Sequence, residues 1–144
     1  MRIRLKKLRE SAVMPIYSTS GSAGADLCAC LEEPVTIMPG ETKMIPLGWA
    51  IEIPEGYVGL AFARSGLATK RGIAPANKVG VIDSDFRGEM MAALHNHSDQ
   101  PQVISGGDRV LQMVIVPCVQ AAFEEAEELS ETGRGEGGWG STGR

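Results

Sequence analysis

Five short segments hold the side chains that could do chemistry, and one near the middle of the chain is the most informative. It places two carboxylates, Asp83 and Asp85, in what is predicted to be the turn of a hairpin between two apolar strands. Together with Gly88 they have the spacing of the first part of a calcium loop. Arg87, however, stands where a third oxygen ligand belongs, and Leu94 stands where the closing Glu is needed. The segment is therefore not a calcium site, and its charges are available for other chemistry.

Arg64 and Ser65 indicate a phosphate site, because they come just before a predicted helical turn over Gly66–Arg71. Ser65 is the residue type of a helix N-cap, and the free N–H groups at a helix start attract phosphate. An Arg directly before the helix adds a charge-assisted contact. The alternative interpretation is an ordinary capped helix with a surface Arg.

Two other segments say little by themselves. Asp26 lies among small residues, where an Asp can serve a ligand or simply cap a turn. The segment Gly107–Met113 has the composition of a turn that enters a strand.

The glycine-rich tail, Arg134–Gly143, has donors that a polyphosphate needs. It lacks the Lys of a P-loop, so it is not a Walker motif. Successive glycine N–H groups, together with Ser141 and Thr142, could still bind phosphate. Trp139 could stack on a base. The alternative is a disordered tail without function.

Taken together, the order and the residue sequences of the five segments resemble the five motifs of the trimeric dUTP pyrophosphatase (dUTPase) family. The segments are Ala23–Leu27, Ala63–Ala68, Gly80–Glu89, Gly107–Met113 and Arg134–Gly143. The resemblance implies hydrolysis of dUTP to dUMP and pyrophosphate with Mg²⁺, which supplies dUMP for thymidylate synthesis and keeps uracil out of DNA. It also implies an all-β, jelly-roll-like barrel of the β-clip type over residues 1–132. The barrel would form a homotrimer with three active sites at subunit interfaces, and the arm over residues 133–144 would close over each site.

The resemblance assigns a role to each matching position. Asp83 matches the general base, which orients a water toward the α-phosphorus and contacts the sugar 3′-hydroxyl. Asp26 matches the carboxylate that holds the magnesium shell through water. The phosphate-binding positions are Arg64, Ser65, Gly66, Gln112, Arg134, Ser141 and Thr142. The positions that contact uracil or deoxyribose are Asn77, Gly80, Val81, Asp83, Phe86 and Trp139. These roles suit phosphoryl chemistry, which needs positioning and charge neutralisation more than covalent help.

At three places the chain has residues that differ from those common in the family's motifs. Phe86 stands where Tyr is usual, so a phenol hydrogen bond is lost while the ring can still exclude a 2′-hydroxyl. Trp139 stands where Phe is usual and could stack on uracil. The pair Lys78-Val79 replaces a small residue and Pro ahead of Gly80. We expect the arm to be mobile without ligand and ordered over dUTP, because six glycines cannot hold one conformation unaided.

Two rival functions differ in class from dUTP hydrolysis. One is a dCTP deaminase, which resembles the same fold, but the deaminases have Arg-Ser-Ser where this chain has Arg-Ser-Gly. No Glu partner for deamination is apparent either. The other is a non-catalytic nucleotide-binding regulatory module, which is disfavoured because every catalytic position holds a competent residue.

The elements that must position these residues are short strands between Gly and Pro turns, which favour a sandwich or closed barrel. The predicted strands are Val35–Ile37, Lys43–Ile53 with an interruption at Pro46, Tyr57–Ala63, Met90–His95 and Val110–Val116. The acidic stretch Ala121–Leu129 is weakly helical, and a solvated connector is the preferred interpretation.

Composition limits the remaining possibilities. The chain has 144 residues, 43% hydrophobic and 22% charged, which suits one globular domain. Its formal net charge of −4 disfavours binding to nucleic acid. The three cysteines lack a C-x-x-C pair and are interpreted as reduced, small apolar residues. No secretory signal or membrane-length apolar run is visible, so a cytoplasmic location is expected.

Overall fold

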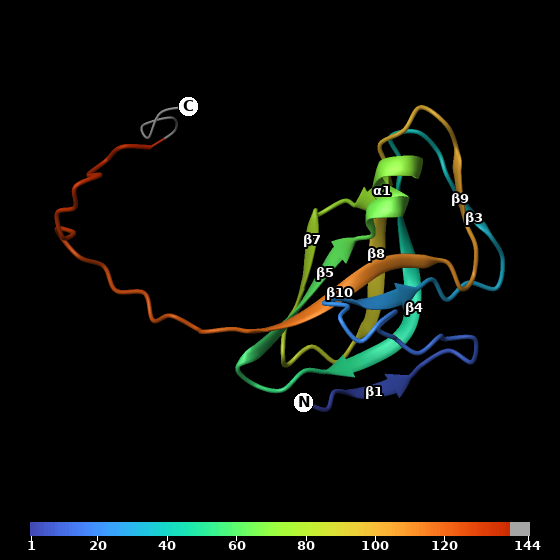
Figure 1. Cartoon of the computed structure of the whole chain (residues 1–144), viewed down its shortest axis with the longest axis horizontal. Coiled ribbons are helices and arrows are strands. Elements are labelled where there is room, and N and C mark those ends of the chain that lie inside the picture. Colours follow the sequence, from blue (N-terminus) through green and yellow to red (C-terminus); the bar gives the residue numbers. More distant parts are fainter. Residues whose placement is uncertain (139–144) are drawn as a thin grey trace.

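The structure, a computed structural model that describes residues 1–138, is built mainly of antiparallel strands (Figure 1). In chain order the strands are β1 (Arg4–Lys7), β2 (Ala25–Cys28), β3 (Val35–Ile37), β4 (Thr42–Glu52), β5 (Tyr57–Ala63), β6 (Ile73–Pro75), β7 (Val79–Ile82), β8 (Glu89–Asn96), β9 (Gln102–Ile104) and β10 (Arg109–Pro117). One short helix, α1 (Ser65–Arg71), follows β5. The all-β class predicted from the sequence is confirmed.

Two four-stranded sheets make up the body. Their strand orders are β1-β4-β8-β6 and β2-β10-β5-β7, and β3 pairs with β9 in a small third sheet. Figure 1 shows the two large sheets as layers, with α1 at one end. Both layers turn apolar side chains inward, for example Ile45 and Leu94 from one and Leu27 and Val110 from the other. This shared core fixes the faces on which the remaining side chains lie.

The five strands predicted from the sequence are all present, and their bounds differ by no more than one residue. The predicted interruption at Pro46 is a register shift of β4 against β8, between Pro46 and Ala50. Within it Gly48 has a φ of 77°, and a Cβ there would lie 2.5 Å from the Cβ of Ala12. Only glycine combines that backbone angle with so close an approach.

The segment around Asp83 is not the turn of a hairpin, as its sequence suggested. Strand β7 pairs with β5, whereas β8 pairs with β4 and β6. Residues 83–88 therefore cross from one sheet to the other. One physical reason is Gly80, where a Cβ would be 3.3 Å from the Cβ of Ala61, so the missing side chain lets β7 lie against β5.

Two of the three cysteines behave as small apolar residues in the core, as predicted. Cys28 and Cys30 are buried and Cys118 is exposed, and all three are free thiols. Burial is the main cause that raises the pKa of the Cys28 thiol, with a smaller contribution from nearby Asp26. Cys28 is therefore a poor nucleophile, although it lies close to charged groups.

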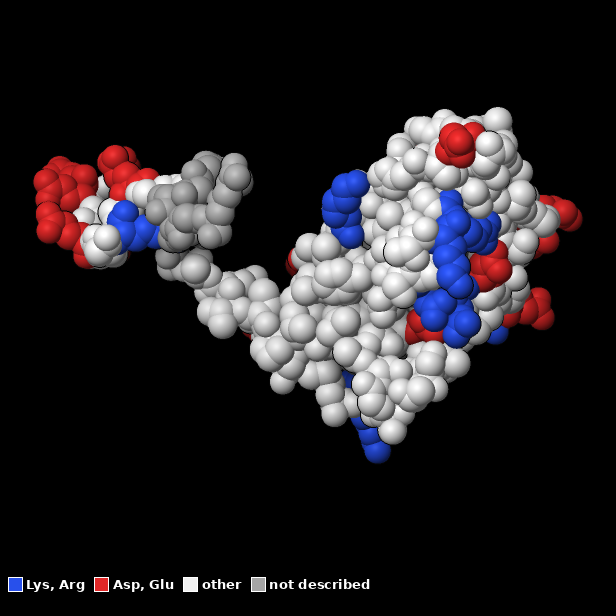
Figure 2. Space-filling view, turned by 45° about the horizontal axis from the view of Figure 1, so that its top comes forward, with Lys and Arg blue, Asp and Glu red and all other residues white. Residues whose placement is uncertain are grey.

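After β10 the chain leaves the body without forming a helix or strand through residue 138 (Figure 1). The predicted solvated connector over residues 121–129 is confirmed. Figure 2 shows acidic side chains gathered on this outlying segment. The segment also carries exposed apolar side chains: Val119, Phe123 and Leu129 are 90%, 99% and 88% accessible. The predictions at Trp139, Ser141 and Thr142 fall outside the described residues.

No helix within residues 1–138 is long and apolar enough to cross a membrane.

Candidate active site

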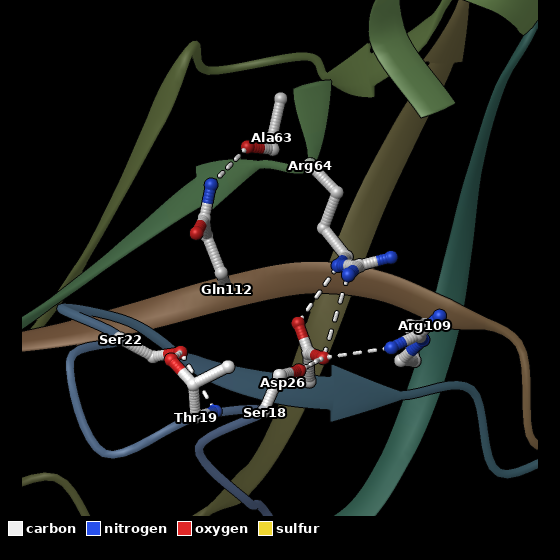
Figure 3. A network of polar contacts seen from close by, with 8 residues as sticks. All are labelled: Ser18, Thr19, Ser22, Asp26, Ala63, Arg64, Arg109 and Gln112. Carbon is white, nitrogen blue, oxygen red and sulfur yellow. Dashed lines mark hydrogen bonds and ion pairs between the residues drawn. The ribbon is translucent and has the colours of Figure 1, made fainter. Parts of the chain in front are cut away.

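Asp26 on β2 is the buried centre of a charged cluster (Figure 3). Only 5% of the residue is exposed. Its Oδ1 accepts a hydrogen bond from Arg64 Nε at 2.7 Å, and Arg64 Nη2 lies 3.4 Å from Oδ2. Ser18 Oγ and Arg109 Nη1 donate to Oδ2 at 3.0 and 3.3 Å. Asp26 is thus not the cap of a turn, the alternative left open by the sequence, because it lies within a strand and its oxygens face two guanidinium groups.

Arg64, and not Ser65, is the N-cap of α1. Its backbone is extended at φ −82° and ψ 131°, no side chain caps the helix, and its carbonyl accepts the N–H of Ala68 at 2.9 Å. Ser65 is the first helical residue, so the predicted Ser cap is wrong by one position. The shift leaves the Arg64 side chain free to turn toward Asp26. Ser65 and Gly66 follow it as exposed residues in the first turn.

Gln112 lies beside Asp26, since the two are register partners in β10 and β2. Its Nε2 donates to the carbonyl of Ala63 at 3.0 Å, so the amide is tied to the residue before Arg64 (Figure 3). Gly24 makes room for this side chain: a Cβ there would be 3.0 Å from Gln112 Oε1. Two predicted phosphate residues, Arg64 and Gln112, therefore lie in one cluster with Asp26, the predicted magnesium residue.

The predicted uracil and deoxyribose residues line a separate pocket of about 350 Å³. Within the described residues, those positions are Asn77, Gly80, Val81, Asp83 and Phe86, and all five line it. This volume is within the range of small-ligand sites. The pocket also reaches apolar side chains of the core, so it can receive a flat apolar ring.

The loop that carries Asp83 and Phe86 is held by its own contacts. Arg87 Nη1 donates to the carbonyls of Ser84 and Phe86 at 2.7 and 2.9 Å. A Cβ on Gly88 would lie 2.8 Å from the ring of Phe86, which packs directly over that glycine. Asp83 itself is exposed, and it lines both the pocket and a broader groove of about 870 Å³. A water can therefore reach its carboxylate.

The pair Lys78-Val79 forms a tight turn directly after Asn77. Lys78 has a φ of 66°, and the N–H of Val79 donates to the carbonyl of Asn77 at 2.7 Å. A proline in place of Val79 could not make this hydrogen bond. Val79, where the family commonly has Pro, thus adds a backbone hydrogen bond beside the pocket.

The two groups of residues lie on opposite faces of the β2-β10-β5-β7 sheet. Asp26 precedes Leu27 and Gln112 follows Leu111, and successive side chains along a strand point to opposite faces. Leu27 and Leu111 line the pocket, whereas Asp26 and Gln112 belong to the charged cluster. One copy of the chain therefore presents the two halves of the predicted site in different directions.

Known proteins share both the sequence and the fold. The sequence profile of the dUTPase family matches residues 10–143. The chain belongs to the dUTPase family. It is 49% identical to the deoxyuridine 5'-triphosphate nucleotidohydrolase of Hahella chejuensis over 139 residues, which cover 96% of this chain and 91% of that protein. It is 53% identical to the protein of the same name from Desulfitobacterium hafniense over 131 residues, 90% and 87% of the two chains.

A solved dUTPase has a closely similar structure. The dUTPase of Staphylococcus bacteriophage 80alpha, solved with dUpNHpp, superposes with a TM-score of 0.87 at 28% identity. The match covers 99% of each chain.

In this member of the dUTPase family, Arg109 and Ser18 were not anticipated from the sequence. Both bond to the Asp26 carboxylate. The signal that could have found Arg109 is its place in the motif Gly107–Met113, two residues after a turn glycine with a φ of 84°. Ser18 carries no such signal, because it lies in a loop rich in Ser and Gly.

Proposed function

We propose that the chain hydrolyses dUTP to dUMP and pyrophosphate. The observation that carries the proposal is the presence in one chain of a ring-sized pocket at Asn77, Asp83 and Phe86 and of a polar cluster that holds Arg64 and Gln112. Family membership and the names of the relatives support the same substrate. The expected location is the cytoplasm.

The chemistry needs a base and a means to neutralise phosphate charge. We assign Asp83 as the base, because its carboxylate is exposed at the rim of the pocket. It would take a proton from the water that attacks the α-phosphorus, while the bond to the bridging oxygen breaks and pyrophosphate leaves. Arg64 and the amide of Gln112 would hold the phosphate oxygens.

Magnesium fits the donors of this site only in an indirect way. Within residues 1–138 no three His, Cys, Asp or Glu side chains lie close enough to form a metal site. Asp26 Oδ1 accepts one bond from Arg64 Nε, so a lone pair is left that can accept a water of a hydrated cation. We therefore propose that Asp26 holds Mg²⁺ through water and that the substrate supplies the remaining oxygens. Bound Mg²⁺ would neutralise phosphate charge.

We propose a homotrimer, and the division of the site supports it. Because the charged cluster and the pocket lie on opposite faces of one sheet, one dUTP cannot reach both on the same copy. A second copy must supply the missing half, which supports the closed assembly expected for the family.

The arm would complete the site from a further copy. The described part, through Gly138, extends away from the body, so it is free to reach a neighbour (Figure 1). We propose that Arg134, Ser141 and Thr142 grip the terminal phosphates and that Trp139 stacks on uracil. Closure would exclude water when the correct nucleotide is bound.

Pyrophosphate release from dUTP, measured with and without Mg²⁺, tests the function directly. We expect release from dUTP and not from dCTP or dTTP, with little release in EDTA. Ammonia release from dCTP would instead identify a deaminase, and binding of dUTP without turnover would identify a regulatory module.

A further inference from the structure

Asp26 has more positive partners than one carboxylate needs. Arg64 and Arg109 both form ion pairs with it, at 2.7 and 3.3 Å, and together they leave the cluster with one positive charge in excess (Figure 3). The proposed function assigns Arg64 to the phosphates, and it leaves Arg109 without a role. The side chain of Asp26 is 6% exposed, whereas that of Arg109 is 53% exposed.

A β-bulge directs Arg109 toward Asp26. In the pairing of β10 with β2, Arg109 is opposite Cys28 while Leu111 is opposite Leu27, so Val110 is an extra residue. Val110 and Leu111 are both buried, at 0% and 3%. In a regular strand without this register shift, alternation would place Arg109 on the same inner face as Leu111, two residues along the chain. The bulge therefore re-aims this side chain to the face that carries Asp26.

Arg64 cannot serve Asp26 and the phosphates equally. Its Nε and Nη2 are directed at the two oxygens of Asp26, and these are donors that a bidentate phosphate contact would use. If Arg64 turned away, a buried carboxylate would lose its nearest cation, which is costly unless another remains. We infer that Arg109 is a positioning residue that keeps Asp26 neutralised when Arg64 turns to the triphosphate of dUTP.

This inference rests on the proposed function and predicts which ligands depend on Arg109. Without Arg109, each transfer of Arg64 to a phosphate would leave Asp26 with no guanidinium in direct contact. Affinity for a triphosphate should fall about tenfold or more, the effect of a charged hydrogen bond. Affinity for dUMP should change less, because dUMP lacks the β- and γ-phosphates.

The test uses calorimetric binding of dUpNHpp and of dUMP to the full-length protein. The variants are Arg109→Gln and Arg109→Lys, each also placed in an Asp26→Asn background. Arg4→Gln is the matched control, since Arg4 also forms an exposed ion pair, with Glu52 on β4. Melting temperature and light scattering are recorded for every variant.

The inference predicts that Arg109→Gln weakens dUpNHpp binding about tenfold and dUMP binding less than about threefold, whereas Arg109→Lys stays within about threefold. In the Asp26→Asn background, Arg109→Gln should cause no further loss, because no charge remains to be neutralised. An equal further loss there would mean that Arg109 contacts the phosphate directly, and would overturn the inference.

Three other results would also overturn the inference. They are a dUpNHpp affinity of Arg109→Lys no higher than that of Arg109→Gln, an affinity of Arg109→Gln no lower than that of the Arg4→Gln control, and a changed oligomeric state of the Arg109 variants. If Asp26→Asn does not fold, the inference is tested by the dUpNHpp affinities of Arg109→Lys and Arg109→Gln. A wild-type protein that does not hydrolyse dUTP would refute the proposed function instead.

Discussion

Two inactive variants should restore each other's activity if each site is divided between copies. Asp83→Asn removes the base from the pocket half, and Arg64→Gln removes the cation from the cluster half. The two halves lie on opposite faces of one sheet, so each active site would take them from different chains. In assemblies mixed at random from equal amounts, a site draws an intact Asp83 half the time and an intact Arg64 half the time. About one quarter of the sites should then be intact at both positions.

The assay is pyrophosphate release after equal amounts of the two variants, carrying different tags, are unfolded together and refolded. Capture through both tags in turn confirms on a sample that the chains have mixed, and activity is measured on the unfractionated mixture. Each variant refolded alone gives the baseline. A chain with both substitutions, refolded with wild-type chain, is the reference, because random mixing again leaves about one quarter of the sites intact. Mixed assemblies that contain both tags but stay at baseline would show that one chain supplies both halves, and the opposite-face argument would be wrong.

Three further predictions can be checked with single variants. Asp83→Asn should lower turnover by about 100-fold or more while dUpNHpp still binds, because the amide keeps the shape but cannot accept a proton; steady-state kinetics and calorimetry decide, and turnover within a few-fold of wild type would remove Asp83 as the base. A chain ended after Gly133 should keep its melting temperature and assembly yet lose turnover and the ligand-induced change in Trp139 fluorescence, and full activity would mean that the arm has no catalytic role. Arg9 lowers the pKa of Glu89, chiefly through its hydrogen bonds. This stabilisation is present above the ordinary carboxyl pKa and lost as pH falls, so the difference in melting temperature between wild type and Arg9→Ala should be largest near neutral pH and shrink in acid; a difference that grows in acid would contradict it.

The long strands could be predicted because their apolar residues alternate or run together between turns. Strand β8 alternates between buried and partly exposed positions from Met90 to Asn96, and β5 is bounded by Gly56 and α1. The strand β2 was missed because its four residues are all buried and include an Asp, so no alternation marks it. Strand β7 was missed because glycine and a β-branched pair next to charges looked like a hairpin turn.

The residue types of the site were readable from the sequence, whereas their directions were not. The pocket residues gathered as expected, since they are close together in one segment. The role of Arg109 depends on a β-bulge in the pairing of β10 with β2, and no sequence pattern around Arg109 predicts that bulge. Asp26 and the pocket lie on opposite faces because Leu27, and not Asp26, points toward the core. The sequence of β2 alone does not show this direction, and it becomes clear only from the pairing of β2 with β10.

The outlying connector also bears on how the protein stays dispersed in solution. Phe123 and Leu129 are almost fully exposed, and a bare apolar segment of this kind invites indiscriminate aggregation. Four glutamates lie between them, at 124, 125, 127 and 128. Like charges next to apolar residues act as gatekeepers against sticking between segments. The glutamates of the connector therefore oppose contact between the exposed apolar side chains of different molecules.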